Sequence, residues 1–336
     1  MNPRDCSPAP PPPPRCVTVT ITTIIALAMS HLTNPLATTE QLLLRSSLSS
    51  VPQDLQESAF VAAQCLTQAA GQLLRAPQAV TAQANVLLAR YWLVDSLMAH
   101  EFSDVSAAVV YLVCKMGPKP RSPRDVANVY SYLLSPGSAL FRTGEPPADD
   151  PKSYYQSETE FLAFSTRIMA LEARILYSLS FDTHVALPHP LAITYLQTLE
   201  FLSRPRSEAS SRVVQYLNTA LLSPQMLYLT HQPHALAVAA IYNAARDIGA
   251  KTPESEWWEV FDVDREELGF LVVAMRSLED WLRQRKDELP VFRERMLTRR
   301  DVEDEMRKRG LAVSNGAGQA EEEAEAMKML DARQAA

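Results

Sequence analysis

Cysteine and histidine, the side chains that most often bind metal ions or act as nucleophiles, are few in this sequence and poorly spaced for either role. The four cysteines lie far apart along the chain, at Cys6, Cys16, Cys65 and Cys114. No two of them have the spacing of a zinc knuckle, and His231 with His234 lacks a cysteine or carboxylate partner at ligand spacing. Cys65 and Cys114 fall within helical patterns, where cysteine packs as a small apolar residue. We therefore expect no metal site, no disulfide framework and reduced thiols, as in an intracellular protein.

Glycine patterns that bind nucleotide phosphates are also missing from the sequence. It contains no Gly-x-x-x-x-Gly-Lys motif, and its only Gly-x-Gly is Gly316-Ala317-Gly318, near the carboxyl end. No Ser/His/Asp or Cys/His set can be recognised from the order of the residues. The sequence thus predicts a protein that is not an enzyme and that needs no cofactor.

Two segments of small residues run through a tyrosine into a cation, and they indicate an internal duplication. They are Ala108-Val109-Val110-Tyr111-Leu112-Val113-Cys114-Lys115 and Ala239-Ala240-Ile241-Tyr242-Asn243-Ala244-Ala245-Arg246. Helices lined with alanine and valine let neighbouring helices approach closely, so each segment is expected at the centre of a bundle. Two copies are too few for a solenoid, which needs at least about three repeats. We therefore predict two compact lobes.

Composition supports an all-α fold with both lobes in one chain. A length of 336 residues suits two domains of ordinary size plus tails. Hydrophobic residues make up 47% of the sequence and only 9 residues are glycine, which favours helix over strand and turn. The net charge of −7 provides no global positive field, so direct binding of nucleic acid is not expected.

The first 50 residues do not resemble a packed domain. Residues 8–14 are prolines interrupted only by Ala9, a run that favours polyproline II. The apolar stretch 17–28 is much shorter than the roughly 20 residues of a membrane span, so no membrane insertion is expected. With Arg4 and Arg15 upstream, this stretch also imitates a secretory signal. The alternatives are a disordered arm over residues 1–50 or a true start at Met29.

Apolar residues then recur at three- and four-residue steps in two successive sets. The first set predicts helices that begin near Pro52, Gln78, Ser103, Ser122 and Ser157, and it defines a domain over residues 51–185. The second set predicts helices over 191–202, 207–222, 234–248, 256–261 and 265–285, within a domain over residues 186–286. Ser122 with Asp125 forms a predicted capping box, and Gly249 a left-handed helix stop. Residues 287–336, with acids at 321–323 and 325, are expected to be a charged tail, either a solvated helix or disordered.

The two predicted bundles, each around a small-residue third helix, resemble the tandem cyclin fold, and particular motifs are similar to the cyclin L group. These motifs are Leu66-Thr67-Gln68-Ala69-Ala70-Gly71, the arginine-rich segment 121–129, Pro188-His189-Pro190 with residues 193–200, Ala239-Ala240-Ile241-Tyr242, and Trp257-Trp258 with Phe261. The resemblance covers residues 54–281. The resemblance implies a member of the cyclin family, most like cyclin L, and we expect the fungal type without an arginine/serine-rich tail.

The resemblance implies a regulatory function rather than catalysis. A cyclin binds a cyclin-dependent serine/threonine kinase beside the mobile regulatory helix of that kinase and holds this helix inward, so that the active-site lysine–glutamate pair forms. In the family, a lysine that ends the third helix and a glutamate in the fifth helix hydrogen-bond the kinase backbone. The matching residues here are Lys115 and Glu172. A flexible ammonium and an ionised carboxylate suit such a clamp, because charged groups make the stronger hydrogen bonds.

The sequence departs from the family pattern directly after Lys115. The family usually continues with an apolar residue and two acids, whereas this chain has Met116-Gly117-Pro118. The third helix must end there, since proline cannot continue it. We therefore expect a kinase contact that lacks two supporting carboxylates.

The resemblance further implies a nuclear protein that acts with a kinase of the PITSLRE type or another transcription-linked kinase, in RNA polymerase II transcription and pre-mRNA processing. A transcription cyclin of the K/T or C type is the alternative. A general transcription factor of the B type shares the double fold but binds DNA through basic helices after a zinc ribbon. Cations between Arg283 and Arg300 are interleaved with acids, so this class is less favoured.

Overall fold

The structure is a computed structural model that describes residues 32–48, 51–138, 140, 152, 154–199, 206–250 and 255–311. Every regular element in these ranges is a helix, and the expected all-α class is confirmed. Several sequence features lie outside the described residues: the proline run, the apolar stretch 17–28, Met29, Gly316–Gly318 and the acidic cluster at 321–325.

The first lobe is built around a helix of small residues. It comprises α3 (Gln53–Leu73), α4 (Gln78–Val94), α5 (Phe102–Met116), α6 (Pro123–Leu134) and α7 (Glu158–Ser178). Helix α5 contacts each of the other four. Ala107, Ala108 and Val109 on α5 are completely buried, which agrees with the predicted central position. Short side chains at these positions allow α5 to be surrounded on several sides.

Polar side chains fix both the interior and the helix starts of this lobe. Ser106 on α5 shares hydrogen bonds with Thr67 of α3, at 2.7 Å, and with Tyr130 of α6, at 2.6 Å. Ser122 and Asp125 form the predicted capping box at the start of α6, and Ser157 forms another at the start of α7. Each box satisfies backbone N–H groups that the first turn of a helix leaves free.

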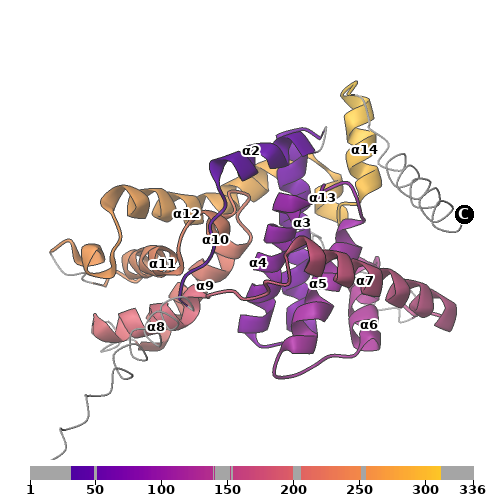
Figure 1. The fold of residues 1–336 in the computed structure, drawn as a ribbon. Coiled ribbons are helices and arrows are strands. Elements are labelled where there is room, and N and C mark those ends of the chain that lie inside the picture. Colours follow the sequence, from indigo (N-terminus) through magenta and orange to yellow (C-terminus); the bar gives the residue numbers. More distant parts are fainter. Residues whose placement is uncertain are drawn as a thin grey trace, which may run out of the picture.

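The second lobe repeats this plan, with a short additional helix before its central helix and a 3-10 helix after it. It comprises α8 (Pro188–Thr198), α9 (Arg206–Leu221), the short α10 (Leu227–Thr230), α11 (Pro233–Asp247), the 3-10 helix η3 (Trp257–Phe261) and α12 (Arg265–Glu288). Helix α11 contacts α8, α9, η3 and α12, with Ala239 and Ala240 fully buried. Gly249 follows the end of α11 in the left-handed conformation, with φ at 63°, as predicted. Figure 1 shows the two lobes side by side, each around its central helix, as the predicted duplication requires.

Residues 32–48 are ordered, which corrects the disorder expected over this part of the amino-terminal arm. They include α2 (Thr39–Leu48), which packs against α4. Asn34 is buried and makes two hydrogen bonds of 2.8 Å with the backbone of Ala186, between the lobes. Its own N–H donates to Gln232 at 3.0 Å, and Ala37 N–H donates to the Leu229 carbonyl at 2.7 Å. The sequence did not indicate this packing because the partners lie more than 150 residues away along the chain.

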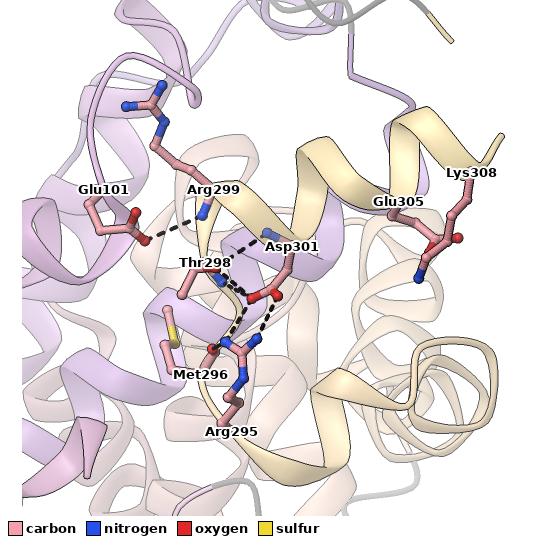
Figure 2. Close-up of polar contacts among 8 residues, drawn as sticks. All are labelled: Glu101, Arg295, Met296, Thr298, Arg299, Asp301, Glu305 and Lys308. Atoms are coloured by element: carbon pink, nitrogen blue, oxygen red, sulfur yellow. Dashed lines mark hydrogen bonds and ion pairs between the residues drawn. The ribbon is translucent and has the colours of Figure 1, made fainter. Parts of the chain in front are cut away.

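The chain after α12 also returns to the first lobe, which corrects the solvated tail expected from residue 287 onward. It forms α13 (Val291–Glu294) and α14 (Arg299–Lys308), with Val302 and Met306 buried. Figure 2 shows the Arg299 N–H donating to Glu101, just before α5, at 3.4 Å. Arg309 pairs with Asp54 of α3 at 2.7 Å. The abundance of charge in α14 conceals these two apolar side chains, which pack into the core.

Candidate functional site

Lys115 and Glu172, the residues that the sequence singled out, lie together in the structure. Lys115 is on the last turn of α5, and its ammonium forms an ion pair with Glu172 of α7. The Lys115 side chain is 50% exposed and that of Glu172 is 10% exposed. The ammonium also lies 5.5 Å from the centre of the Tyr111 ring, a cation–π contact. A charged pair at the surface, with one member accessible, can exchange its internal contact for hydrogen bonds to a partner.

The glycine that follows α5 is packed closely against α4. Gly117 follows directly, and a Cβ at this position would lie 3.1 Å from the Val80 methyl group and 3.3 Å from the Val113 carbonyl oxygen. A larger side chain would therefore require Val80 to move. Lys115 thus lies at the carboxyl end of the α5 dipole, where a cation is favoured.

Further ion pairs hold α7 against the rest of the first lobe. Arg167 donates to Asp104 of α5 at 2.9 Å. Arg174 donates to both carboxylate oxygens of Asp95, at 2.7 and 3.3 Å, and the Tyr91 hydroxyl donates to the same carboxylate at 2.7 Å. Burial opposes ionisation of Asp95, but the hydrogen bonds from Arg174 and Tyr91 outweigh it and lower the pKa of Asp95. The orientation of α7 is therefore fixed before any partner binds.

The outward face of α7 is apolar, and sequence reasoning missed it. Leu162, Met169 and Tyr177 are exposed by 57%, 50% and 73%, and Phe181 beyond the helix is exposed by 61%. The inward face carries the buried side chains Phe164, Ile168, Leu171 and Ile175. A helix that needs only one apolar face for packing has a second one here, and contiguous exposed apolar surface marks interaction sites. The signal was the spacing of 162, 169 and 177, out of phase with the core residues.

A groove of about 350 Å³ lies along α7, on the flank opposite the Lys115–Glu172 pair. It is lined by Asp104, Arg167, Ala170 and Leu171, together with residues 100 and 101 and Arg174. Burial and the nearby Arg174 lower the pKa of His100, whereas burial raises the pKa of Glu101. The exposed face of α7 thus lies between this groove and the Lys115–Glu172 pair.

The other candidate residues do not form a site. His231 stacks on Phe270 at 5.3 Å and accepts or donates a hydrogen bond with Thr230 at 2.9 Å. Cys65 and Cys114 are free thiols. Within the described ranges, no group of three or more histidine, cysteine or acidic side chains is arranged to hold a metal ion. None of the helices described is both long and apolar enough to cross a bilayer.

Comparison with curated proteins identifies relatives of this chain. It is 30% identical to Cyclin-L1 of Gallus gallus over 260 residues and 30% identical to Cyclin-L2 of Homo sapiens over 262 residues, each covering 76% of the chain. It is 33% identical over 208 residues to Cyclin-L1 of Homo sapiens. The chain belongs to the cyclin family. No protein-family model matches it. This cyclin spans less than half the length of these first two relatives, 43% and 46% of them.

A solved structure supports the cyclin fold independently. The chain is similar to a chain of the yeast RNA Pol II CTD kinase CTDK-1 complex, with a TM-score of 0.57. The similarity covers 79% of this cyclin and 86% of that chain at 15% sequence identity. At this identity the likeness concerns the fold alone, which agrees with two lobes built around α5 and α11.

Proposed function

We propose that this cyclin is the regulatory subunit of a cyclin-dependent serine/threonine kinase and that it binds the kinase through α5 and α7 of the first lobe. The cyclin contributes no catalytic group. Its role is to hold the mobile helix of the kinase inward, so that the active-site lysine–glutamate pair of the kinase forms.

The observation that carries this proposal is the continuity of the Lys115–Glu172 pair with the exposed apolar face of α7. The ion pair supplies charged donors and acceptors for backbone groups, and Leu162, Met169 and Tyr177 supply apolar area beside it. An apolar centre with a polar rim is the usual composition of a protein interface. The ion pairs of Arg167 and Arg174 keep this surface rigid, which reduces the entropy lost on binding.

We further propose that the partner is a transcription-linked kinase, of the PITSLRE type or another type, and that the complex acts in the nucleus in RNA polymerase II transcription and pre-mRNA processing. The similarity to cyclins L1 and L2 supports this assignment. A cyclin of the K/T or C type is the alternative. Identification of the kinase that co-purifies with the full-length chain from nuclear extract distinguishes these two assignments.

The proposed domains are the two cyclin boxes, residues 51–185 and 186–286, with a segment on each side that packs back onto them. The boundary between the boxes lies in the segment that joins α7 to α8, where Gln83 and Arg90 donate to the carbonyls of Thr183 and His184 at 2.7 Å.

The kinase-binding proposal is tested with the identified kinase and purified variants. Lys115→Glu should reduce both affinity and kinase activation sharply, and Met169→Asp should do the same by placing a charge in the apolar face. Val273→Asp on α12 is the matched control, because Val273 is equally an exposed apolar residue but lies on the second lobe. Normal activation by Lys115→Glu and Met169→Asp proteins would show that another surface holds the kinase.

A further inference from the structure

A second charged surface lies next to Lys115, where the end of α3 meets the loop between α5 and α6. This loop holds Lys119 and Arg121, and Arg75 follows α3 with φ at 51°. We call Arg75, Lys119 and Arg121 the cationic patch. Arg121 Nη2 donates to the Arg75 carbonyl at 3.4 Å, which brings these two parts of the chain together.

The cationic patch differs from the neighbouring cations because, among the described residues, no ion pair neutralises its charges. Lys115 pairs with Glu172, and Arg124 pairs with Glu158 while its guanidinium lies 3.8 Å from the centre of the Phe161 ring. In contrast, none of the three patch residues forms an ion pair with any residue that the structure describes. The Arg121 Nε is buried without a hydrogen-bond acceptor in the described part of the chain. In a protein of net charge −7, such a local excess of positive charge is unusual.

The nearest carboxylate is committed to a structural role. Asp125 accepts hydrogen bonds from the Ser122 hydroxyl, at 2.8 Å, and from the Ser122 N–H, at 3.1 Å. These hydrogen bonds, with a smaller contribution from Arg121, lower the pKa of Asp125. Asp125 therefore offsets part of the field of Arg121 but accepts none of the hydrogen bonds that the structure describes for this guanidinium.

Apolar side chains adjoin the patch and favour a peptide over RNA. Leu73 lies two residues before Arg75 and Met116 directly follows Lys115, and the two are exposed by 47% and 49%. Single-stranded nucleic acid is usually held by aromatic side chains that stack on its bases, and no exposed aromatic residue adjoins these cations in the sequence. A surface with both cationic and exposed apolar side chains is instead complementary to a peptide that carries acidic and apolar residues.

We propose that the cationic patch binds an acidic or phosphorylated segment of the partner kinase and thereby extends the interface beyond Lys115. This inference rests on the proposed function, since Lys119 and Arg121 lie in the loop that directly follows α5, the helix whose last turn carries Lys115. The shared chemistry is an anionic group, a carboxylate or a phosphate, received by guanidinium and ammonium donors. Charged groups at the rim of an interface act mainly on the association rate, so the patch should accelerate encounter with the kinase.

The test compares full-length variants with the kinase identified by co-purification. Neutralisation of the patch (Arg75→Gln, Lys119→Gln, Arg121→Gln) should lower affinity about tenfold, mainly through slower association, and should weaken the salt dependence of association. A charge-keeping variant (Arg75→Lys, Lys119→Arg, Arg121→Lys) should retain most of the affinity. The matched control is Arg283→Gln, Arg307→Gln, Lys308→Gln, which removes the same charge from exposed positions of α12 and α14. Equal melting temperatures establish that all variants are folded.

The outcomes separate this inference from the proposed function. If Lys115→Glu abolishes binding while the neutralised patch binds at the wild-type rate with the wild-type salt dependence, the patch proposal is overturned and the kinase surface stands. If the Lys115→Glu and Met169→Asp variants both bind the kinase normally, the proposed kinase-binding surface is wrong, whatever the patch variants do. Phosphatase treatment of the kinase identifies the source of the anion: a wild-type rate reduced to that of the neutralised variant indicates phosphate, and an unchanged rate indicates carboxylates. Binding of single-stranded RNA that is lost in the neutralised variant, with kinase association unchanged, would also overturn the proposal.

Discussion

Lys115 and Glu172 bind each other in the free protein, so a single substitution at either residue changes two things at once. It removes the internal ion pair, and it changes the charge that a kinase would meet. Because Glu172 is largely buried, loss of its partner leaves a carboxylate with reduced solvation. The two effects can be separated by exchanging the residues.

The exchange Lys115→Glu with Glu172→Lys is expected to restore the ion pair but not kinase binding. The melting temperature should return toward that of the wild type, since opposite charges again face each other. Kinase binding should not return, because the donor and the acceptor that the kinase backbone would meet have exchanged places. Thermal melts and a kinase-binding assay on both single variants and the double variant measure this. Full recovery of binding in the double variant would assign the pair a purely structural role.

Asn34 is the residue on which the packing of the amino-terminal arm depends. Its side chain satisfies both the N–H and the carbonyl of Ala186, in the segment between the lobes. Asn34→Ala should leave buried backbone groups without partners and destabilise the protein by roughly 1–3 kcal/mol. Denaturant unfolding measures the loss, with Asn128→Ala on the exposed surface of α6 as the control. Equal stability of the two variants would show that the arm contributes nothing to the fold.

At the scale of single elements, the small residues of α5 and α11 determine how closely the other helices approach. Ala240 is completely buried at the centre of α11, which contacts α8, α9 and α12. Ala240→Leu should overpack the second lobe and cost roughly 1–3 kcal/mol. The corresponding control is Val273→Leu, at an exposed position of α12. A melting temperature unchanged by Ala240→Leu would contradict the role of α11 as the tightly packed centre.

At the scale of the whole molecule, a half-buried histidine beside a contact between the lobes predicts acid sensitivity. The Asn218 side-chain oxygen accepts from Gln78 of the first lobe at 2.8 Å and lies 3.0 Å from His189 Nε2. Burial lowers the pKa of His189 from 6.5, although the contact with Asn218 opposes this, and its Nδ1 has no partner among the described residues. The unfolded chain therefore takes up a proton at a higher pH than the folded protein does.

Stability should consequently be constant above the unfolded pKa of about 6.5 and fall as the pH drops below it. Burial also lowers the pKa of His100 and of His231, which adds to the same trend. His189→Gln, which keeps a donor for Asn218, should reduce the loss of stability between pH 7.5 and pH 5.5. Denaturant unfolding at several pH values checks this, and an identical pH dependence in the variant would exclude His189 as a contributor.

The terminal segments provide a second prediction at this scale. A chain that begins at Met29 keeps the contacts of Asn34 and α2, so it should melt and bind its kinase like the full-length protein. A chain that begins at Val51 loses these contacts and should melt at a lower temperature. If secretion removed residues up to Ala28, mass spectrometry would find the mature end at Met29 in a secreted fraction, which would contradict the proposed nuclear location.

Local sequence patterns determined the helical class, the two central helices, the capping boxes and the similarity to cyclins. These features depend on residues within one or two helical turns of each other, such as Ser122 with Asp125 or the spacing of alanines along α11. They are therefore visible before the chain is folded.

Tertiary structure alone decided which surfaces the chain covers and which it exposes. The pairing of Lys115 with Glu172 joins residues 57 positions apart, and the contact of Arg309 with Asp54 spans 255 positions. The second apolar face of α7, the packing of Asn34 between the lobes and the return of α14 to the first lobe depend equally on distant partners. A hydrogen bond or ion pair between such residues leaves no periodic trace in the sequence, because the only requirement is that the folded chain brings complementary groups within reach.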